Sequence, residues 1–111
     1  MKAAALVGQW SFDRSCGLYD LVFTATDVSF FDYANPSHVI SYDGVWEIGA
    51  DNRVTLTLRR LDGRGAPNGE ALLYYLDVTG PAPDLVGTFG QAGAAARAIN
   101  AKRCANAGDR Q

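Results

Sequence analysis

The sequence predicts an all-β protein that folds as a single small antiparallel up-and-down β-barrel of about seven or eight strands. Three observations support this fold class. Apolar and polar residues alternate with a period of two through most of the chain, as in strands that bury one face. Turn-forming residues separate these segments, because the chain has 12 glycines and ten of its 12 acidic residues are Asp. Strand-like segments also stand near both chain ends, and pairing between them would close the sheet and remove its edges.

Alternating patterns predict the strands in order along the chain. The clearest one places Ile40 and Trp46 on one face and Asp43 on the other. In the third segment Phe30 and Phe31 are adjacent, so one of them is expected outside the core. The sixth segment is apolar on both faces, and its outer face is expected to be covered. The expected strands cover residues 8–12, 18–25, 27–33, 39–48, 54–61, 70–79, 85–90 and 99–104.

The connections between these segments carry turn chemistry. Residues 49–52 read Gly-Ala-Asp-Asn and tolerate the left-handed backbone angles of a hairpin turn. Residues 62–69 hold three glycines and a proline, which is typical of a longer loop between strands. Residues 80–84 form a proline-stiffened turn. Residues 92–98 are rich in alanine, the best helix former, so this stretch is either a short C-terminal helical turn or a loop.

The length of 111 residues suits one domain, residues 1–111, with the barrel over about residues 7–104 and flexible ends at 1–6 and 105–111. The start contains one lysine and an apolar run shorter than a secretory signal, so we interpret it as the remainder of a trimmed export signal or as a start introduced for expression. No segment has the roughly 18 apolar residues of a membrane span.

Two cysteines, Cys16 and Cys104, are either buried thiols or a disulfide. Each one ends a strand-like segment near a terminus, which favours the disulfide. A disulfide implies an oxidising compartment, so the sequence predicts a periplasmic or secreted protein.

The two ends of the chain also carry a family resemblance. Gly8-Gln9-Trp10 on the first strand, with a basic residue on the last, resembles the Gly-x-Trp and closing Arg or Lys of the calycins, the superfamily of lipocalins and bacterial metalloprotease inhibitors. The resemblance implies that Arg103 lies over Trp10, with Lys102 and Arg97 as alternatives. The chain is short for a lipocalin. Its length, and a cysteine soon after the Gly-x-Trp, are more similar to the inhibitors, although those have their second cysteine in mid-chain. The alternative is that Trp10 is a core residue of an unrelated β-sandwich.

Composition and motifs argue against several functions. The net charge of −2 supplies no field that would attract nucleic acid. His38 is the single histidine and stands in a turn-rich loop, where a solvated side chain is the common outcome. No cofactor motif or metal-ligand spacing is present in the sequence. We therefore expect a non-catalytic protein without a cofactor or metal.

Aromatic residues that cannot all face one core indicate a contact surface for a partner or for a second copy of the chain. The predicted partner-binding residues are Phe30, Phe31, Tyr33, His38 and Tyr75. The bulky inward residues are expected to fill a barrel of about eight strands, which leaves function to its faces and loops. The leading hypothesis is thus an exported binding module for a protein or cell-envelope component. The alternatives are an inhibitor of a secreted metalloprotease and a carrier of a small apolar ligand.

Overall fold

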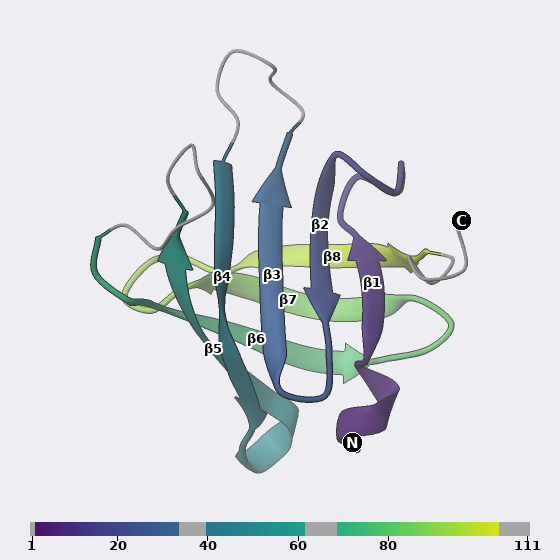
Figure 1. Cartoon of the computed structure of the whole chain (residues 1–111). Helices are drawn as coiled ribbons and strands as arrows, with labels where there is room; N and C mark the ends of the chain where they lie inside the picture. Colours follow the sequence, from purple (N-terminus) through teal and green to yellow (C-terminus); the bar gives the residue numbers. More distant parts are fainter. Residues whose placement is uncertain (1, 34–39, 62–68, 105–111) are drawn as a thin grey trace.

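The computed structural model describes residues 2–33, 40–61 and 69–104, which form a closed barrel of eight antiparallel strands (Figure 1). Each strand pairs with the next one along the chain, and β1 pairs with β8 to close the ring. The predicted up-and-down barrel is therefore confirmed. The strands are β1 (Gly8–Ser11), β2 (Tyr19–Phe23), β3 (Asp27–Asp32), β4 (Ile40–Ile48), β5 (Arg53–Arg60), β6 (Leu72–Gly80), β7 (Leu85–Gln91) and β8 (Arg97–Arg103).

Two single turns of 3-10 helix complete the regular structure of the described residues. The first, η1 (Ala3–Ala5), precedes β1, and Leu6 directly after it is fully buried. The predicted start of the barrel near residue 7 thus leaves out one core residue. The second, η2 (Ala50–Asn52), joins β4 to β5, and Asp51 and Asn52 have the left-handed φ values of 58° and 60° expected of this turn.

A helical turn between residues 92 and 98 is not formed, so this sequence-based alternative is wrong. Gly93 has a φ of +87°, and the Ala94 amide donates to the Gln91 carbonyl at 3.0 Å, which makes a tight turn. β8 then begins at Arg97 and pairs with β7. The hydrogen bonds of this hairpin outweigh the intrinsic preference of alanine for helix, which is a weak effect at each residue.

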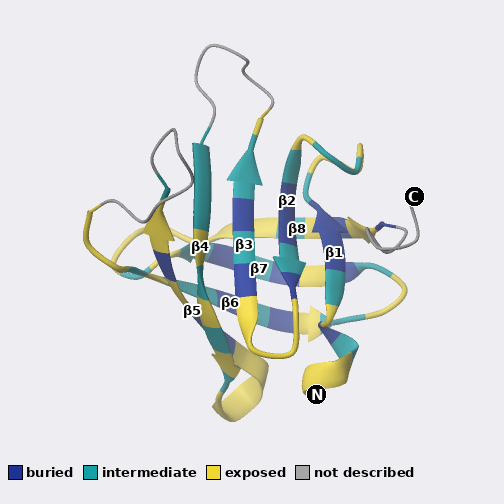
Figure 2. Ribbon diagram, viewed as in Figure 1, coloured by how far each residue is buried: buried dark blue, intermediate teal, exposed yellow. Residues whose placement is uncertain are grey.

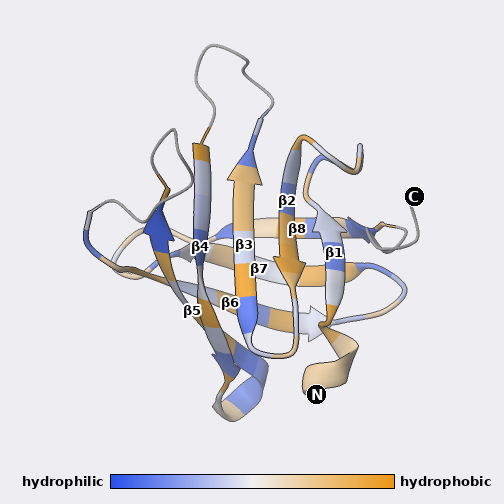
Figure 3. Ribbon diagram, viewed as in Figure 1, coloured by the Kyte–Doolittle hydropathy of each residue, from blue (hydrophilic) through white to orange (hydrophobic). Residues whose placement is uncertain are grey.

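The alternation along the strands sorts the side chains into a filled interior and a mainly polar exterior. Figure 2 shows buried and exposed positions alternating along the strands, and Figure 3 shows that hydropathy alternates with them. Among the described residues, the buried hydrophobic core consists of Leu6, Trp10, Leu21, Phe23, Val28, Phe30, Val54, Leu56, Leu58, Leu76, Val78, Leu85, Phe89 and Ala101. Phe12, Tyr19, Tyr42, Trp46, Ile48, Tyr74 and Ile99 pack against it.

Two glycines allow neighbouring strands to approach closely. A side chain at Gly44 of β4 would overlap the backbone carbonyl of Thr57 on β5. A side chain at Gly87 of β7 would overlap the carbonyl of Asp77 on β6. Glycine within a strand often marks such a close approach or a bend, and these positions let the sheet coil tightly enough to close.

Candidate functional site

The barrel is closed at one end by Trp10 and Arg103, which are directly opposite each other on β1 and β8. The Arg103 guanidinium carbon lies 4.3 Å from the Trp10 ring centroid, in the geometry of a cation–π contact. The same guanidinium donates to the carbonyls of Val7 and Ala5, each at 3.1 Å. Gly8 has a φ of +139°, which favours glycine, and it lies directly beside the Arg103 guanidinium. The basic residue over the tryptophan is therefore Arg103.

The two alternative cations lie elsewhere on β8. Lys102 is exposed and pairs with Ser11 of β1, on the face opposite to Arg103. Arg97 stands at the other end of the same strand and pairs with Phe89. Neither side chain is placed to cover Trp10.

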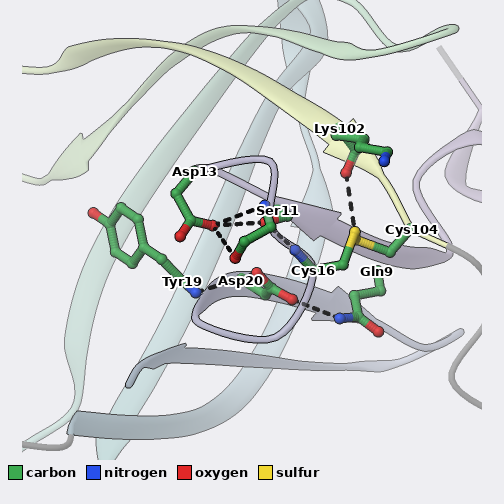
Figure 4. Close-up of a disulfide and its surroundings, with 9 residues drawn as sticks. Gln9, Ser11, Asp13, Cys16, Tyr19, Asp20, Lys102 and Cys104 are labelled. Carbon is green, nitrogen blue, oxygen red and sulfur yellow. Dashed lines mark hydrogen bonds between the residues drawn. A yellow bond between two sulfur atoms is a disulfide. The ribbon is translucent and has the colours of Figure 1, made fainter. Parts of the chain in front are cut away.

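The predicted disulfide between Cys16 and Cys104 is present, with Cα atoms 5.8 Å apart (Figure 4). It fastens the connection between β1 and β2 to the residue that follows β8. The Cys16 amide donates to the Ser11 hydroxyl at 3.0 Å, and the Cys104 amide donates to the Gln9 carbonyl at 2.9 Å. The disulfide therefore reinforces the seam between the first and last strands.

Beneath this connection lies a buried polar cluster that the sequence patterns did not reveal (Figure 4). Asp20 and Ser11 are fully buried and Gln9 nearly so, although the strand alternation places all three on the outer face. The Gln9 amide donates to the Asp20 carboxylate at 2.5 Å. In the sequence, polar residues that alternate with Trp10 and Phe12 are expected to face solvent. No local pattern indicates that the connection over residues 12–18 folds back over these polar side chains.

Asp13 organises the connection itself. Its carboxylate accepts hydrogen bonds from the Ser11 and Ser15 hydroxyls, each at 2.9 Å. Desolvation acts to raise the pKa of Asp13, but the hydrogen bonds from Ser15 and Ser11 outweigh it and hold the pKa below its usual value. The ionised carboxylate thus favours the turn that carries Cys16.

Three apolar side chains lie together on the outside of the barrel, where β2 begins and β3 ends. We call Leu18, Phe31 and Tyr33 the outer aromatic patch. The rings of Phe31 and Tyr33 stack with centroids 4.7 Å apart at 27°. The Tyr33 amide donates to the Leu18 carbonyl at 2.6 Å, which brings Leu18 beside them. Leu18 is 45% and Tyr33 40% exposed, so these apolar groups face solvent.

Of the remaining predicted partner-binding residues, Phe30 and Tyr75 do not join this patch. Phe30 points inward and is only 9% exposed, and its ring stacks on Tyr42 with centroids 5.8 Å apart. Of the two adjacent phenylalanines, Phe31 is therefore the one on the outside of the barrel. His38 lies outside the described residues. Tyr75 lies on β6, and both β4 and β5 separate it from β3.

Tyr75 is covered by a charged pair on the outer surface. The Arg53 guanidinium carbon lies 4.2 Å from the Tyr75 ring centroid. Arg53 also donates to both carboxylate oxygens of Asp77, at 2.8 and 3.1 Å. The hydrogen bond from Arg53 lowers the pKa of Asp77. The outer face of the sixth strand is therefore covered at Tyr75 as expected, but the expectation is wrong at Leu73, which lies on the same face and is 37% exposed.

The interior end opposite Trp10 is packed with aromatic rings. Phe30, Tyr74 and Phe89 contact one another, with centroid distances from 5.5 to 6.3 Å. Burial raises the pKa of Tyr74, and the neighbouring Tyr42 raises it further. The cavity beside this cluster has a volume of about 120 Å³. Ordinary ligand pockets hold at least about 300 Å³, so this space is small.

A larger hollow of about 520 Å³ lies on the outer surface, against Asp43, Val45 and Arg59. No group of three or more His, Cys, Asp or Glu side chains gathers in a metal-binding arrangement among residues 2–33, 40–61 and 69–104. Over the same residues, no helix is long and apolar enough to cross a membrane. Comparison of the chain with protein families, curated proteins and solved structures finds no match.

Proposed function

We propose that this protein is a non-catalytic, calycin-like binding module that works in an oxidising compartment outside the cytoplasm and docks a partner protein on its outer aromatic patch. The observation that carries the proposal is that Leu18 and Tyr33 are exposed beside the half-buried Phe31, whose ring stacks on the ring of Tyr33. Large aromatic side chains in contact surfaces supply much of the binding energy, because they bury a large area with few rotatable bonds.

The filled interior supports a function on the surface. The aromatic cluster around Phe30 occupies the end of the barrel away from Trp10, and the cavity beside it has only about 120 Å³. A binding module is therefore favoured over a carrier of a small apolar molecule, which would need a larger enclosed space.

The closing end supports the calycin-like part of the proposal. An eight-stranded closed barrel with Arg103 over Trp10, and with glycine at position 8, is what the resemblance implies. The disulfide between Cys16 and Cys104 supports an oxidising compartment.

The test compares capture of partners by surface variants. The Phe31→Ser/Tyr33→Ser double variant removes both rings of the patch, and Val45→Ser is the matched control, because Val45 is 55% exposed on β4 outside the patch. Each protein is immobilised with its disulfide intact and incubated with periplasmic and secreted proteins, and bound proteins are quantified by mass spectrometry. We expect a partner retained by the wild type and by Val45→Ser but reduced about tenfold or more by the double variant, a change of about 1.4 kcal/mol. Equal capture by all three proteins would refute the patch as the docking surface.

A second candidate function is inhibition of a secreted metalloprotease. Arg103 holds the segment before β1 against the barrel through the carbonyls of Ala5 and Val7. The motivation for this candidate is the resemblance of the Gly8 to Cys16 stretch, with a cysteine soon after the Gly-x-Trp, to the bacterial inhibitors. The test is an assay of secreted bacterial metalloproteases with the full chain present. Undiminished protease activity at a large molar excess of the protein would eliminate this candidate.

A further inference from the structure

The barrel seam is only partly closed by strand pairing. β8 pairs with β7 from Arg97 to Ala101. On its other edge it pairs with β1 at Arg103 and Lys102 only, because β1 ends at Ser11. Figure 1 shows β1 meeting β8 only near the end of that strand. The first half of β8 therefore has one edge without a neighbouring strand in the part of the chain that the structure describes.

The backbone groups on this free edge follow from the antiparallel pattern. The Cys104 amide donates to the Gln9 carbonyl, so residue 104 presents its backbone groups towards β1. Hydrogen-bonding groups on a strand alternate between its two edges, so Asn100 and Ala98 face the same side as Cys104. Both residues are exposed. The Asn100 carbonyl accepts a hydrogen bond from Arg14 at 3.2 Å, whereas no described backbone group pairs with the amides of Ala98 and Asn100.

The cavity of about 120 Å³ lies against this same edge. It is lined by Arg97, Ala98, Ile99, Asn100, Phe12, Tyr19 and Phe89. Successive residues of a strand point to opposite faces, so a cavity that contacts four in a row must lie against the edge of the strand. The other wall is aromatic. The volume of the cavity equals that of roughly four water molecules, which suits one valine or leucine side chain.

The charge beside the cavity is positive. Arg97 is exposed and forms no ion pair within the described residues, whereas Arg14 pairs with Asp84 at 3.3 Å. Arg97 and Ile99 share a face of β8, so a peptide strand lying along the edge could place an apolar and an acidic side chain two residues apart on that face. The unpaired amides of Ala98 and Asn100, a cavity for one apolar side chain and an unpaired cation thus occur together among the described residues.

We propose that the free edge of β8 at residues 97–100 binds an extended peptide segment of a partner protein, which adds a strand to the barrel. The peptide pairs with the backbone groups of Ala98 and with the amide of Asn100, inserts one aliphatic side chain beside Phe12 and Phe89, and places a carboxylate near Arg97. Addition of a strand to an exposed sheet edge is a common mode of peptide recognition, in which backbone hydrogen bonds give affinity and side-chain pockets give specificity. This site is distinct from the outer aromatic patch and does not depend on the function proposed for it.

The test uses blocked pentapeptides as probes, acetyl-Thr-Leu-Thr-Asp-Thr-amide and the reversed order, and follows the amide signals of the protein by NMR. We expect saturable binding with a dissociation constant on the order of 0.1 to 1 mM, with the main shifts at Ala98, Ile99 and Asn100. Replacing the leucine of the peptide by lysine should weaken binding about tenfold or more, because the aromatic cavity would have to accept a charge. Equal binding of the lysine peptide, or no binding at about 5 mM of either leucine peptide, would overturn the proposal.

Variants of the protein separate this site from other surfaces. Arg97→Glu should weaken binding about fivefold or more and recover it when the peptide aspartate is replaced by lysine. Lys102→Glu is the matched control, an exposed cation on the same strand that lies outside the cavity, and it should leave the affinity unchanged. Ala98→Pro removes the edge amide and should abolish binding where the variant keeps its fold. Shifts confined to Leu18, Phe31 and Tyr33, or equal affinity of Arg97→Glu and Lys102→Glu, would place the peptide elsewhere and refute the inference.

Discussion

Removal of the Arg103 side chain is expected to open the closed end of the barrel and destabilise the whole fold. Arg103 makes one cation–π contact with Trp10 and two hydrogen bonds to the carbonyls of Ala5 and Val7. An exposed cation–π contact contributes about 0.5 to 1 kcal/mol. Each hydrogen bond from a charged donor contributes about 1 kcal/mol once solvent exposure of the guanidinium is taken into account. Arg103→Ala should therefore lower the free energy of unfolding by roughly 2 to 3 kcal/mol.

The assay is urea unfolding at neutral pH, monitored by the fluorescence of the two tryptophans, Trp10 and Trp46. Lys102→Ala is the control, because Lys102 is an exposed cation next in sequence that does not contact Trp10. It should change the free energy of unfolding by less than about 0.5 kcal/mol. Arg103→Lys should fall between the two, since lysine keeps the charge but lacks the planar fork that reaches both carbonyls. Equal stability of Arg103→Ala and Lys102→Ala would refute the idea that this contact closes the barrel.

Three further predictions concern other parts of the fold. Replacing Cys16 and Cys104 by serine opens a loop of 88 residues, which should lower the free energy of unfolding by about 4 to 5 kcal/mol in the chain-entropy model. A loss below about 1 kcal/mol, measured by calorimetry, would contradict this prediction. Gly44→Ala should destabilise the protein by more than about 2 kcal/mol, because the new methyl group meets backbone, whereas Gly80→Ala has open space and should fold normally by circular dichroism. Burial raises the pKa of Tyr74 above its ordinary value of 10.0. The unfolded chain therefore loses this proton at a lower pH than the folded protein does, and the free energy of unfolding falls as the pH rises from about 10. Tyr74→Phe should make this alkaline decline shallower, and an unchanged slope would contradict the raised pKa.

The order of the strands and the closing contacts could be predicted from the sequence, because both depend on local patterns. Alternation with a period of two places the strands, and turn residues such as Asp51 and Asn52 separate them. Gly8, Trp10 and Arg103 could be assigned to the closed end only because two short motifs stand at the two ends of the chain. Between neighbouring strands, an up-and-down order leaves few alternatives for pairing.

The features that could not be predicted depend on register and on long-range packing. Period-two alternation states that Phe30 and Phe31 face opposite sides, but only the pairing of Phe30 with the inward Leu21 decides which one is buried. Asp20 is buried because a connection folds back over the outer face of the barrel. The alternation of residues along one strand does not indicate whether another segment covers that strand. The free edge of β8 likewise arises because β1 stops pairing at Ser11, which depends on where the chain turns in space.

The ring of strands has one junction, between β1 and β8, that joins distant parts of the chain, and this makes the molecule a candidate for circular permutation. Joining residue 111 directly to residue 1 and opening the chain between β6 and β7 would turn the contact of Trp10 with Arg103 into a local one. Cys16 and Cys104 would then be separated by 23 residues instead of 88, so the disulfide would contribute about 1 kcal/mol less through chain entropy. In such a permutant the new ends would be joined by the β6–β7 ladder alone, without a covalent link.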